Sequence, residues 1–234
     1  MYELSASLAL AGDLIAAGDA RLAGIVLLSL KVSLGATLVS CVLGMPLGAL
    51  LAVGRFAGRR SLIVLFNGLM GLPPVVVGLL VYLLLSRAGP LGQFGLLFTP
   101  TAMVVAQIVL ITPIIAALTR QVIEDEWREF REQLRSLGAS RVRAARTLLW
   151  NGRFSLTTSA LAGFGRAIAE VGAVMIVGGN IDGVTRVMTT TIALETSKGD
   201  LPLALALGAI LIGVVLAINA LAYAFRQWAE RRWG

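Results

Sequence analysis

Long apolar stretches alternate with short polar ones along the chain, and one polar stretch is much longer than the rest. Five apolar stretches are long enough, at about 1.5 Å per residue, to cross a hydrocarbon core roughly 30 Å thick. They occupy residues 22–53, 62–85, 101–119, 156–177 and 203–225. We therefore predict an all-α integral membrane protein with about five transmembrane helices in one domain at 22–225.

Prolines interrupt some of these predicted spans. Pro73 and Pro74 stand together near the middle of the second span and remove two amide donors. Within lipid, such a break is tolerated only where protein or a watery cavity covers the exposed carbonyl groups. The pair therefore predicts a kink, which serves either helix packing or the lining of a pore. Gly78 nearby would allow close helix contact, and Pro46 should bend the first span.

The segments outside the spans are short. Apolar residues at helical spacing within 1–21 (Leu4, Leu8, Ala11 and Ile15) predict a short interfacial or extracytoplasmic helix. Residues 178–183 have the composition of a turn. The stretch 187–196 contains three consecutive threonines, so we predict a short surface helix too polar to span. Residues 226–234 form a basic tail.

The one long polar stretch covers residues 120–154 and contains eight arginines and five carboxylates. Apolar and polar positions alternate with helical periodicity at 124–135 and 141–149. Gly138 should end the first helix, because glycine tolerates the left-handed conformation of many helix caps. Ser140 is a suitable N-cap for the second. The pattern predicts a folded docking surface in water, and a solvated charged loop is the alternative.

The distribution of basic residues predicts the orientation in the membrane. With the N-terminus outside and five spans, the segments 55–61, 120–154 and 226–234 are cytoplasmic and hold fourteen Lys and Arg residues, against four on the opposite side. This asymmetry follows the positive-inside rule and predicts a cytoplasmic C-terminus in a plasma (inner) membrane. The net charge of +7 is therefore a topology signal and does not favour nucleic-acid binding.

Two ionisable residues lie within the predicted fourth span. Arg166 and Glu170 are four positions apart, so a continuous helix would place them on one face, where they can pair. Charged groups at this depth cost a few kcal/mol each and usually face a bundle interior or a pathway. In one interpretation, Arg166 helps an anion across the membrane and Glu170 holds the arrangement. In the other, the two residues satisfy one another, or Glu170 pairs with Lys31, and they only fix helix packing.

The sequence offers little for catalysis. It contains no histidine, one cysteine (Cys41) and no G-x-x-x-x-G-K-[ST] phosphate-binding motif. The commonest general base and metal ligand is thus missing, and ATP would have to be bound by another subunit. We expect a non-catalytic membrane subunit that binds no metal and no cofactor of its own.

The polar stretch resembles the cytoplasmic "EAA" loop of ATP-binding-cassette (ABC) importer permeases. Glu132 and Leu134 are followed by Gly138 and Leu148 at the spacing of that loop, although Trp150-Asn151 stands where the pattern has Leu-Pro. The resemblance implies the type I (MetI-like) permease fold and a coupling helix that docks onto an ATPase. It assigns this coupling to Glu132, Leu134, Gly138, Ala139 and Arg141.

A longer match narrows the substrate. The run from Ile168 to Ile181, continued by 185–190 and 193–200, is similar to tungstate-specific permeases within the molybdate/tungstate/sulfate branch. This implies a homodimer with two cytoplasmic ATPase subunits that use ATP and Mg²⁺, and an extracytoplasmic protein that delivers tungstate or molybdate. Sulfate or another anion, or a stand-alone channel or secondary carrier, are the alternatives. The candidates for the pathway or its gate are Pro73, Pro74, Arg166, Glu170 and Asn180.

Overall fold

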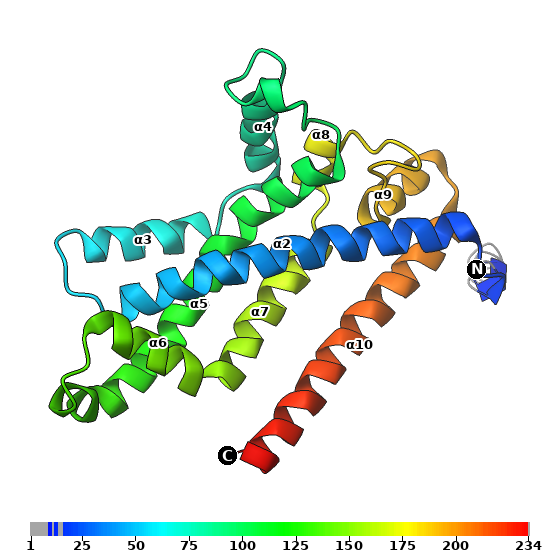
Figure 1. The fold of residues 1–234 in the computed structure, drawn as a ribbon. Coiled ribbons are helices and arrows are strands. Elements are labelled where there is room, and N and C mark those ends of the chain that lie inside the picture. Colours follow the sequence, from blue (N-terminus) through cyan, green and yellow to red (C-terminus); the bar gives the residue numbers. More distant parts are fainter. Residues whose placement is uncertain (1–8, 11, 14–15, 234) are drawn as a thin grey trace. The chain divides into compact units, whose positions relative to one another are not determined.

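The protein is helical throughout the part that the computed structural model describes, which comprises residues 9–10, 12–13 and 16–233 (Figure 1). The helices are α2 (Ala20–Val53), α3 (Arg59–Leu69), α4 (Pro74–Leu85), η1 (Gly92–Phe94), α5 (Pro100–Ser136), α6 (Arg141–Asn151), α7 (Arg153–Ile168), α8 (Gly172–Gly178), α9 (Met188–Lys198) and α10 (Leu201–Trp233). The all-α prediction is confirmed for these residues. The apolar positions predicted to form an N-terminal helix (Leu4, Leu8, Ala11 and Ile15) lie outside them.

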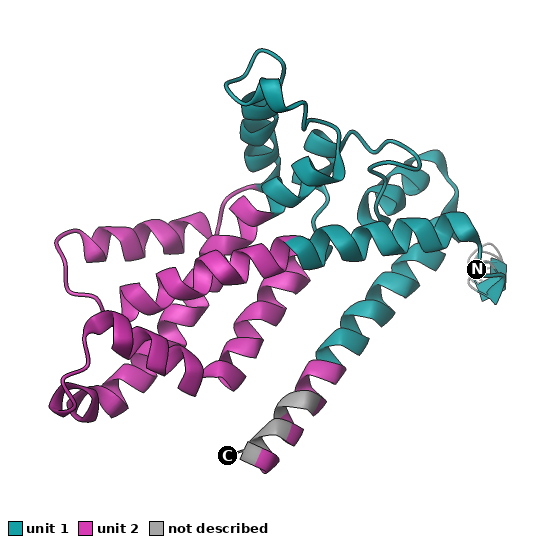
Figure 2. Ribbon diagram, viewed as in Figure 1, with its two compact units in different colours: residues 1–35, 74–107, 168–220 teal, residues 36–73, 108–167, 221–234 magenta. Residues whose placement is uncertain are grey.

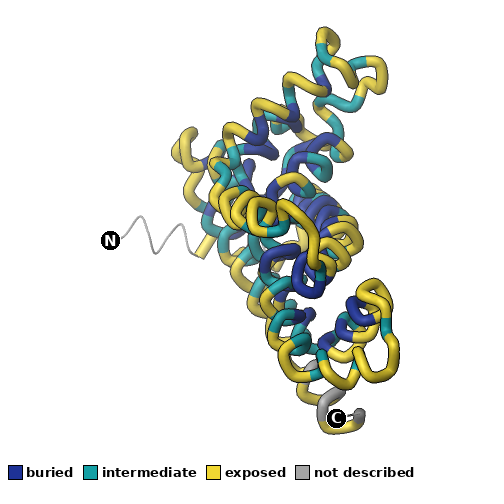
Figure 3. The backbone as a smooth tube through the Cα atoms, turned by 90° about the vertical axis from the view of Figure 1, so that its left-hand side faces the viewer, coloured by how far each residue is buried: buried dark blue, intermediate teal, exposed yellow. Residues whose placement is uncertain are grey.

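Three of the described helices are long and apolar enough to cross a membrane: α2, α5 and the first part of α10. The pairs α3–α4 and α7–α8 each pass the same test when they are counted together, which raises the number to five. Exposed residues run along the helices, coloured yellow in Figure 3, and many of them are large and apolar, such as Val64 on α3 and Leu216 on α10. Lipid or other subunits would cover such side chains.

The chain forms two compact units (Figure 2). Unit 1 contains residues 1–35, 74–107 and 168–220, and unit 2 contains residues 36–73, 108–167 and 221–234. Among the described helices, α2, α5 and α10 contribute residues to both, and α7 contributes its last residue, Ile168, to unit 1.

Local sequence explains where several helices begin. Pro74 and Pro100 occupy the first positions of α4 and α5, where a missing amide hydrogen costs nothing. The Oγ1 atom of Thr99 accepts a hydrogen bond from the amide of Ala102 at 3.4 Å. The predicted break at the proline pair is confirmed, because α3 ends at Leu69 and α4 starts at Pro74.

In unit 2, α2, α5 and α6 pack around small and aliphatic side chains. This core consists of Ala49, Ala52, Val53, Ile123, Ala145 and Leu148. A Cβ atom at Gly48 would lie 2.3 Å from the carbonyl oxygen of Ala116, so only glycine allows α2 to approach α5 this closely.

In unit 1, α4 packs against α8. A Cβ atom at Gly78 would lie 2.7 Å from the Cα atom of Ala173. The predicted close contact at Gly78 is therefore confirmed. The amide of Phe98 donates to the carbonyl of Val177 at 2.9 Å, which ties the segment before α5 to α8.

Three boundaries differ from the sequence predictions. The predicted third span and the first helix of the polar stretch form one continuous helix, α5, which runs through Pro113. The predicted fourth span is broken, since α7 ends at Ile168 and α8 starts at Gly172. The helix α10 continues to Trp233, so the predicted tail prolongs the last span as a helix.

The predicted surface helix at 187–196 exists as α9, but its assignment to the surface is wrong. Met188, Thr190 and Thr191 are buried. The hydroxyls of Thr190 and Thr191 donate to the carbonyl of Val187 at 3.1 and 2.7 Å. Because these threonines satisfy their own hydroxyl groups locally, they can be buried at little cost.

Candidate functional site

The arginine-rich hairpin, residues 120–151, joins the end of α5 to α6 through a turn at Leu137–Ala139. The amide of Ala139 donates to the carbonyl of Leu134 at 2.9 Å, and that of Gly138 to the carbonyl of Arg135 at 3.0 Å. With Gly138 at φ 66°, these two bonds form a Schellman cap. The predicted helix end at Gly138 is confirmed.

The second helix of the hairpin is fixed at its start. The Oγ atom of Ser140 accepts a hydrogen bond from the amide of Arg143 at 3.4 Å, as predicted for an N-cap. The guanidinium of Arg141 donates to the carbonyl of Arg55 at 2.8 Å. This contact joins the start of α6 to the loop after α2 and makes Arg141 a structural residue as well as a surface one.

The predicted coupling residues divide between the inside and the outside of the hairpin. Leu134 packs against the core of unit 2, and Ala139 is half-buried. Glu132, Gly138 and Arg141 are exposed.

Two apolar side chains of this surface were not predicted, Leu137 and Val142, which are 80% and 68% exposed. The sequence signal that could have revealed them is an apolar residue among polar ones on each side of Gly138. Exposed apolar side chains within a charged surface are typical of a binding interface.

The hairpin carries a concentration of positive charge. The pKa of the fully exposed Arg135 guanidinium lies below its ordinary value, mainly because Arg131 is close and, to a smaller extent, because of desolvation and of Arg55 and Arg141. Like charges held this close repel one another unless an acidic partner or salt screens them.

One carboxylate holds the base of the hairpin. Glu124 accepts from Arg59 at 2.7 Å and from Arg120 at 2.6 Å. The Nε atom of Arg59 also donates to the carbonyl of Leu51 at 2.6 Å, where α2 ends. A cation at a helix C-terminus is favourable because the unpaired carbonyl groups there carry partial negative charge. Sequence reasoning missed this cluster, since Arg59 and Glu124 lie 65 positions apart.

The pathway candidates lie at the two breaks and in the turn after α8. Pro73 and Pro74 flank the start of α4. Arg166 belongs to α7, whereas Glu170 follows the end of α7, so the expected single helix face for Arg166 and Glu170 is wrong.

Glu170 is buried and fixes the start of α8. Its Oε1 atom accepts from the amide of Ala173 at 3.0 Å, and its carbonyl oxygen accepts from the hydroxyl of Thr189 at 2.7 Å. A carboxylate at a helix N-terminus binds unpaired amides and offsets the helix dipole. The geometry therefore gives Glu170 at least a capping role between α8 and α9.

The turn predicted at 178–183 is confirmed. Gly179, Asn180 and Gly183 have φ values of 71°, 50° and 72°. The hydroxyl of Thr185 donates to the carbonyl of Gly178 at 2.6 Å and accepts from the amide of Ile181 at 2.9 Å, which closes the loop. The side-chain oxygen of Asn180 is buried and makes no hydrogen bond with any residue that the structure describes.

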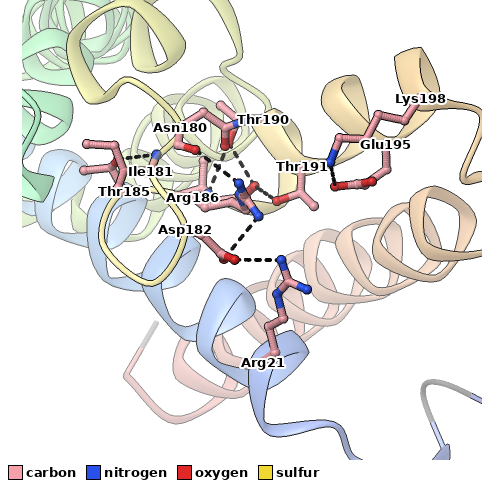
Figure 4. A network of polar contacts seen from close by, with 11 residues as sticks. Arg21, Asn180, Ile181, Asp182, Thr185, Arg186, Thr190, Thr191, Glu195 and Lys198 are labelled. Atoms are coloured by element: carbon pink, nitrogen blue, oxygen red, sulfur yellow. Dashed lines mark hydrogen bonds and ion pairs between the residues drawn. The ribbon is translucent and has the colours of Figure 1, made fainter.

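A polar network extends from this turn to the start of α2 (Figure 4). Asp182 pairs with Arg21 at 2.7 Å and with Arg186 at 3.1 Å, and Arg186 also reaches the carbonyl of Asn180 at 3.5 Å. Ser29 on α2 accepts from the amide of Met188 at 2.7 Å. Arg21 and Asp182 are separated by 161 positions, and no local pattern in the sequence indicated their contact.

Among the described residues, no three His, Cys, Asp or Glu side chains gather where they could hold a metal ion. Several of the charged side chains described above, such as Glu124, Arg141 and Asp182, bind one another or backbone groups. The hairpin presents exposed charge and exposed apolar side chains, and the turn after α8 holds a cluster of charged side chains.

Comparison with known proteins gives a consistent result. Residues 44–234 match the family described as "Binding-protein-dependent transport system inner membrane component". The chain is 40% identical to the tungstate uptake system permease protein TupB of Peptoclostridium acidaminophilum, over 92% of this chain and 94% of that protein. It is 38% identical to a probable anion ABC transporter permease protein of Haloferax volcanii, over 94% and 99%. The TupB of Campylobacter jejuni is 36% identical, over 74% and 72%.

Proposed function

The chain belongs to the family of binding-protein-dependent transport system inner membrane components and is an ABC importer permease subunit, and from this premise we propose that its substrate is tungstate. The observation that supports tungstate as the substrate is the 40% identity, over nearly the whole chain, to a protein named for tungstate uptake. Relatives named as sulfate transport system permease proteins share less, for example 29% for that of Salmonella typhimurium and 25% for one of Synechocystis. Molybdate is the second candidate, since a relative named as a putative molybdenum permease also shares 29%.

The arginine-rich hairpin is the proposed docking element for an ATPase subunit. Two hydrogen bonds close its cap, Arg59 joins its base to α2 and α3, and Leu137 and Val142 expose apolar area among positive charges. These features support an interface that a partner with an acidic, partly apolar groove would cover. ATP and Mg²⁺ would be bound by that partner, and this chain would bind no cofactor.

A homodimer with two ATPase subunits is the proposed assembly. Five spans are few for enclosing a polar route, and the apolar window of α10 is only 17% buried within the chain. Ile212 and Leu216 are exposed on this helix. A second copy or lipid would remove this area from water.

The proposed orientation places the N-terminus outside and the hairpin in the cytoplasm of an inner-membrane protein. The fourteen basic residues of the segments 55–61, 120–154 and 226–234 support it, against four on the other side. An extracytoplasmic binding protein would then deliver the oxyanion near Arg21, Arg186 and the turn after α8.

The proposed pathway includes the interrupted helices. Pro73 and Pro74 interrupt the helix before α4, and the segment 169–171 interrupts it before α8. Such backbone within a membrane must face protein or water. Glu170 holds the start of α8, and Arg166 and Asn180 add polar groups before and after it along the sequence. This supports a gate along this segment of the chain.

The test is the tungsten and molybdenum content of cells with and without this chain, measured by mass spectrometry at nanomolar supply of each oxyanion. Loss of tungsten alone supports a tungstate importer. Loss of both metals indicates a general molybdate/tungstate permease. No change in either would contradict the substrate and leave only the assignment to ABC importer permeases.

A further inference from the structure

Two arginines of unit 1 share a single aspartate. The Oδ2 atom of Asp182 accepts a hydrogen bond from Arg21 at 2.7 Å, and its Oδ1 atom forms an ion pair with Arg186 at 3.1 Å. A carboxylate carries one negative charge and two guanidiniums carry two positive charges. The cluster therefore keeps one positive charge that Asp182 does not neutralise.

The other carboxylates near Arg21 are engaged elsewhere. Asp19 accepts from the backbone amide of Arg21 at 2.8 Å. Asp200 accepts from the amide of Leu203 at 3.4 Å, and Glu195 pairs with Lys198 at 3.0 Å. None of these three contacts reaches a guanidinium group, and the cavity that Arg21, Asp182 and Arg186 line contains none of the three carboxylates. They keep their negative charges in a neighbouring pocket that also contains Arg21.

Arg186 has spare hydrogen-bonding capacity in a buried position. Its side chain is only 12% exposed. Its Nε atom is buried and has no acceptor among the residues that the structure describes, and its contact with the carbonyl of Asn180 is long, at 3.5 Å. A buried guanidinium with an unused donor is costly unless an acceptor binds to it.

A cavity of about 300 Å³ adjoins these groups. Arg21, Asp182 and Arg186 line it together with the apolar side chains of Ile25 and Leu28. The lining of the cavity thus combines two guanidinium groups, one carboxylate and a partly apolar wall. Guanidinium donors in such a setting suit a compact anion with several equivalent oxygens.

We propose that this cavity, the Arg21–Arg186 site, transiently binds the transported tetrahedral oxyanion, whose oxygens replace Asp182 as acceptors for the two arginines. This inference rests on the proposed function and adds a substrate contact to it. Asp182 acts as a built-in competitor. It lowers the affinity for the anion, and it neutralises part of the charge again when the anion leaves, so that a dianion is not trapped.

The role of Asp182 gives the proposal a specific test. Loss of Asp182 should strengthen tungstate binding, whereas loss of either arginine should weaken it. The assay is equilibrium dialysis of the purified permease–ATPase complex against tungstate, without the binding protein, with bound tungsten measured by mass spectrometry. Asp182→Asn should bind tungstate about tenfold more tightly, and Arg21→Gln and Arg186→Gln about tenfold more weakly, the change expected for one charge-assisted hydrogen bond. Sulfate should compete in all variants that bind.

The matched control is Lys198→Gln, which removes a cation of the same unit that does not line the cavity. It should leave tungstate binding unchanged. Arg186 is buried, so Arg186→Gln could unfold the protein. Arg21 is 58% exposed, and Arg21→Gln therefore decides the question for the arginines.

Unchanged tungstate binding in Arg21→Gln, or binding no tighter in Asp182→Asn, would overturn the site. An equal loss in Lys198→Gln would also overturn it, because the effect would then be one of overall charge. Uptake of tungstate by the wild-type importer in liposomes is measured in parallel. Its absence refutes the proposed substrate, whereas normal uptake together with unchanged variants refutes the Arg21–Arg186 site alone.

Discussion

The arginine-rich hairpin and the segment that follows α8 place polar groups in opposite ways. The hairpin is densely charged, yet residues such as Glu132, Arg135 and Arg141 face outward. The segment 179–198 has few charges, yet Arg186 is largely buried and Thr190 and Thr191 are fully so. Exposed charge costs little and can be presented to a partner, whereas buried polar groups are costly unless each finds a bond or a ligand.

The two regions also use glycine differently. Gly138 in the hairpin has a positive φ and open space around its Cα, so it is needed for its conformation. Gly78 packs against α8, which immediately precedes the second region, and is needed for its small size, because backbone atoms of Ala173 lie where a side chain would be. The hairpin can therefore change its surface without repacking, and the second region cannot.

The largest effect is expected from filling the space at Gly78. In Gly78→Val a Cβ atom would lie 2.7 Å from the Cα atom of Ala173, which is backbone and cannot rotate away. We expect a loss of about 3 kcal/mol or more in the free energy of unfolding. Thermal unfolding of the purified protein measures this. Gly68→Val on α3 is the control, since a Cβ atom there meets nothing within 4 Å; equal stability of the two variants would refute the close packing of α4 on α8.

The next effect tests whether the partly buried ion pairs at the base of the hairpin contribute to the free energy of unfolding. Glu124→Gln would leave Arg59 and Arg120 without their shared carboxylate, and both are partly buried. We expect unfolding to be easier by about 2 kcal/mol, less than for a fully buried pair because water screens this site.

Asp125→Asn provides the matched control for Glu124→Gln. Asp125 pairs with Arg128 at 3.2 Å on the exposed surface, and its loss should cost below about 0.5 kcal/mol. Thermal unfolding midpoints in the same detergent compare the two variants. If they unfold at the same temperature, the bridge at Glu124 contributes no more than a surface pair.

The same contrast explains which features could be predicted from the sequence. Breaks and caps depend on residues close in sequence, so Pro74, Gly138 and Ser140 were identified correctly. The break after Ile168 has no proline to mark it, and continuity of α5 through Pro113 was hidden by the change from apolar to polar residues. These boundaries are set by packing rather than by local propensity.

Long-range polar contacts were the other limit. Asp182 meets Arg21 and Glu124 meets Arg59 across 161 and 65 positions, and a single sequence holds no periodicity that pairs them. Three adjacent threonines indicate a surface helix by composition, although their hydroxyls can bond to the preceding turn and be buried. Surface charge was therefore located correctly, and buried polarity was not.

A smaller effect on stability, with a large effect on assembly, is expected at the tip of the hairpin. In Gly138→Val a β-branched residue would have to adopt φ 66°, which costs about 1–2 kcal/mol. The turn would reopen and displace Leu137 and Arg141 from the docking surface. We expect the ATPase subunit to be lost on co-purification while the chain still inserts into the membrane.

Gly138→Asn is the matched control, because asparagine tolerates the left-handed conformation. It should retain the ATPase, since a Cβ atom at this position has open space around it. If Gly138→Val retained the ATPase as well, docking would not depend on this turn. If Gly138→Asn lost it, the interface would require the absence of a side chain rather than the turn conformation.

The smallest effect is expected at Arg135, where the destabilising repulsion between exposed charges can be measured separately from their contribution to ATPase binding. Arg135 lies close to Arg131, Arg55 and Arg141, whose repulsion lowers its pKa. Arg135→Gln should therefore raise the unfolding temperature of the isolated permease slightly at low salt. The gain should vanish at high salt, where charges farther apart than about 3 Å are screened at 1 M ionic strength. The same variant should bind the ATPase more weakly, because the partner loses one cation to pair with. A gain in stability without any loss of ATPase binding would mean that the hairpin's charge serves orientation in the membrane alone. The contrast with the largely buried Arg186 of unit 1 would then concern stability and not partner binding.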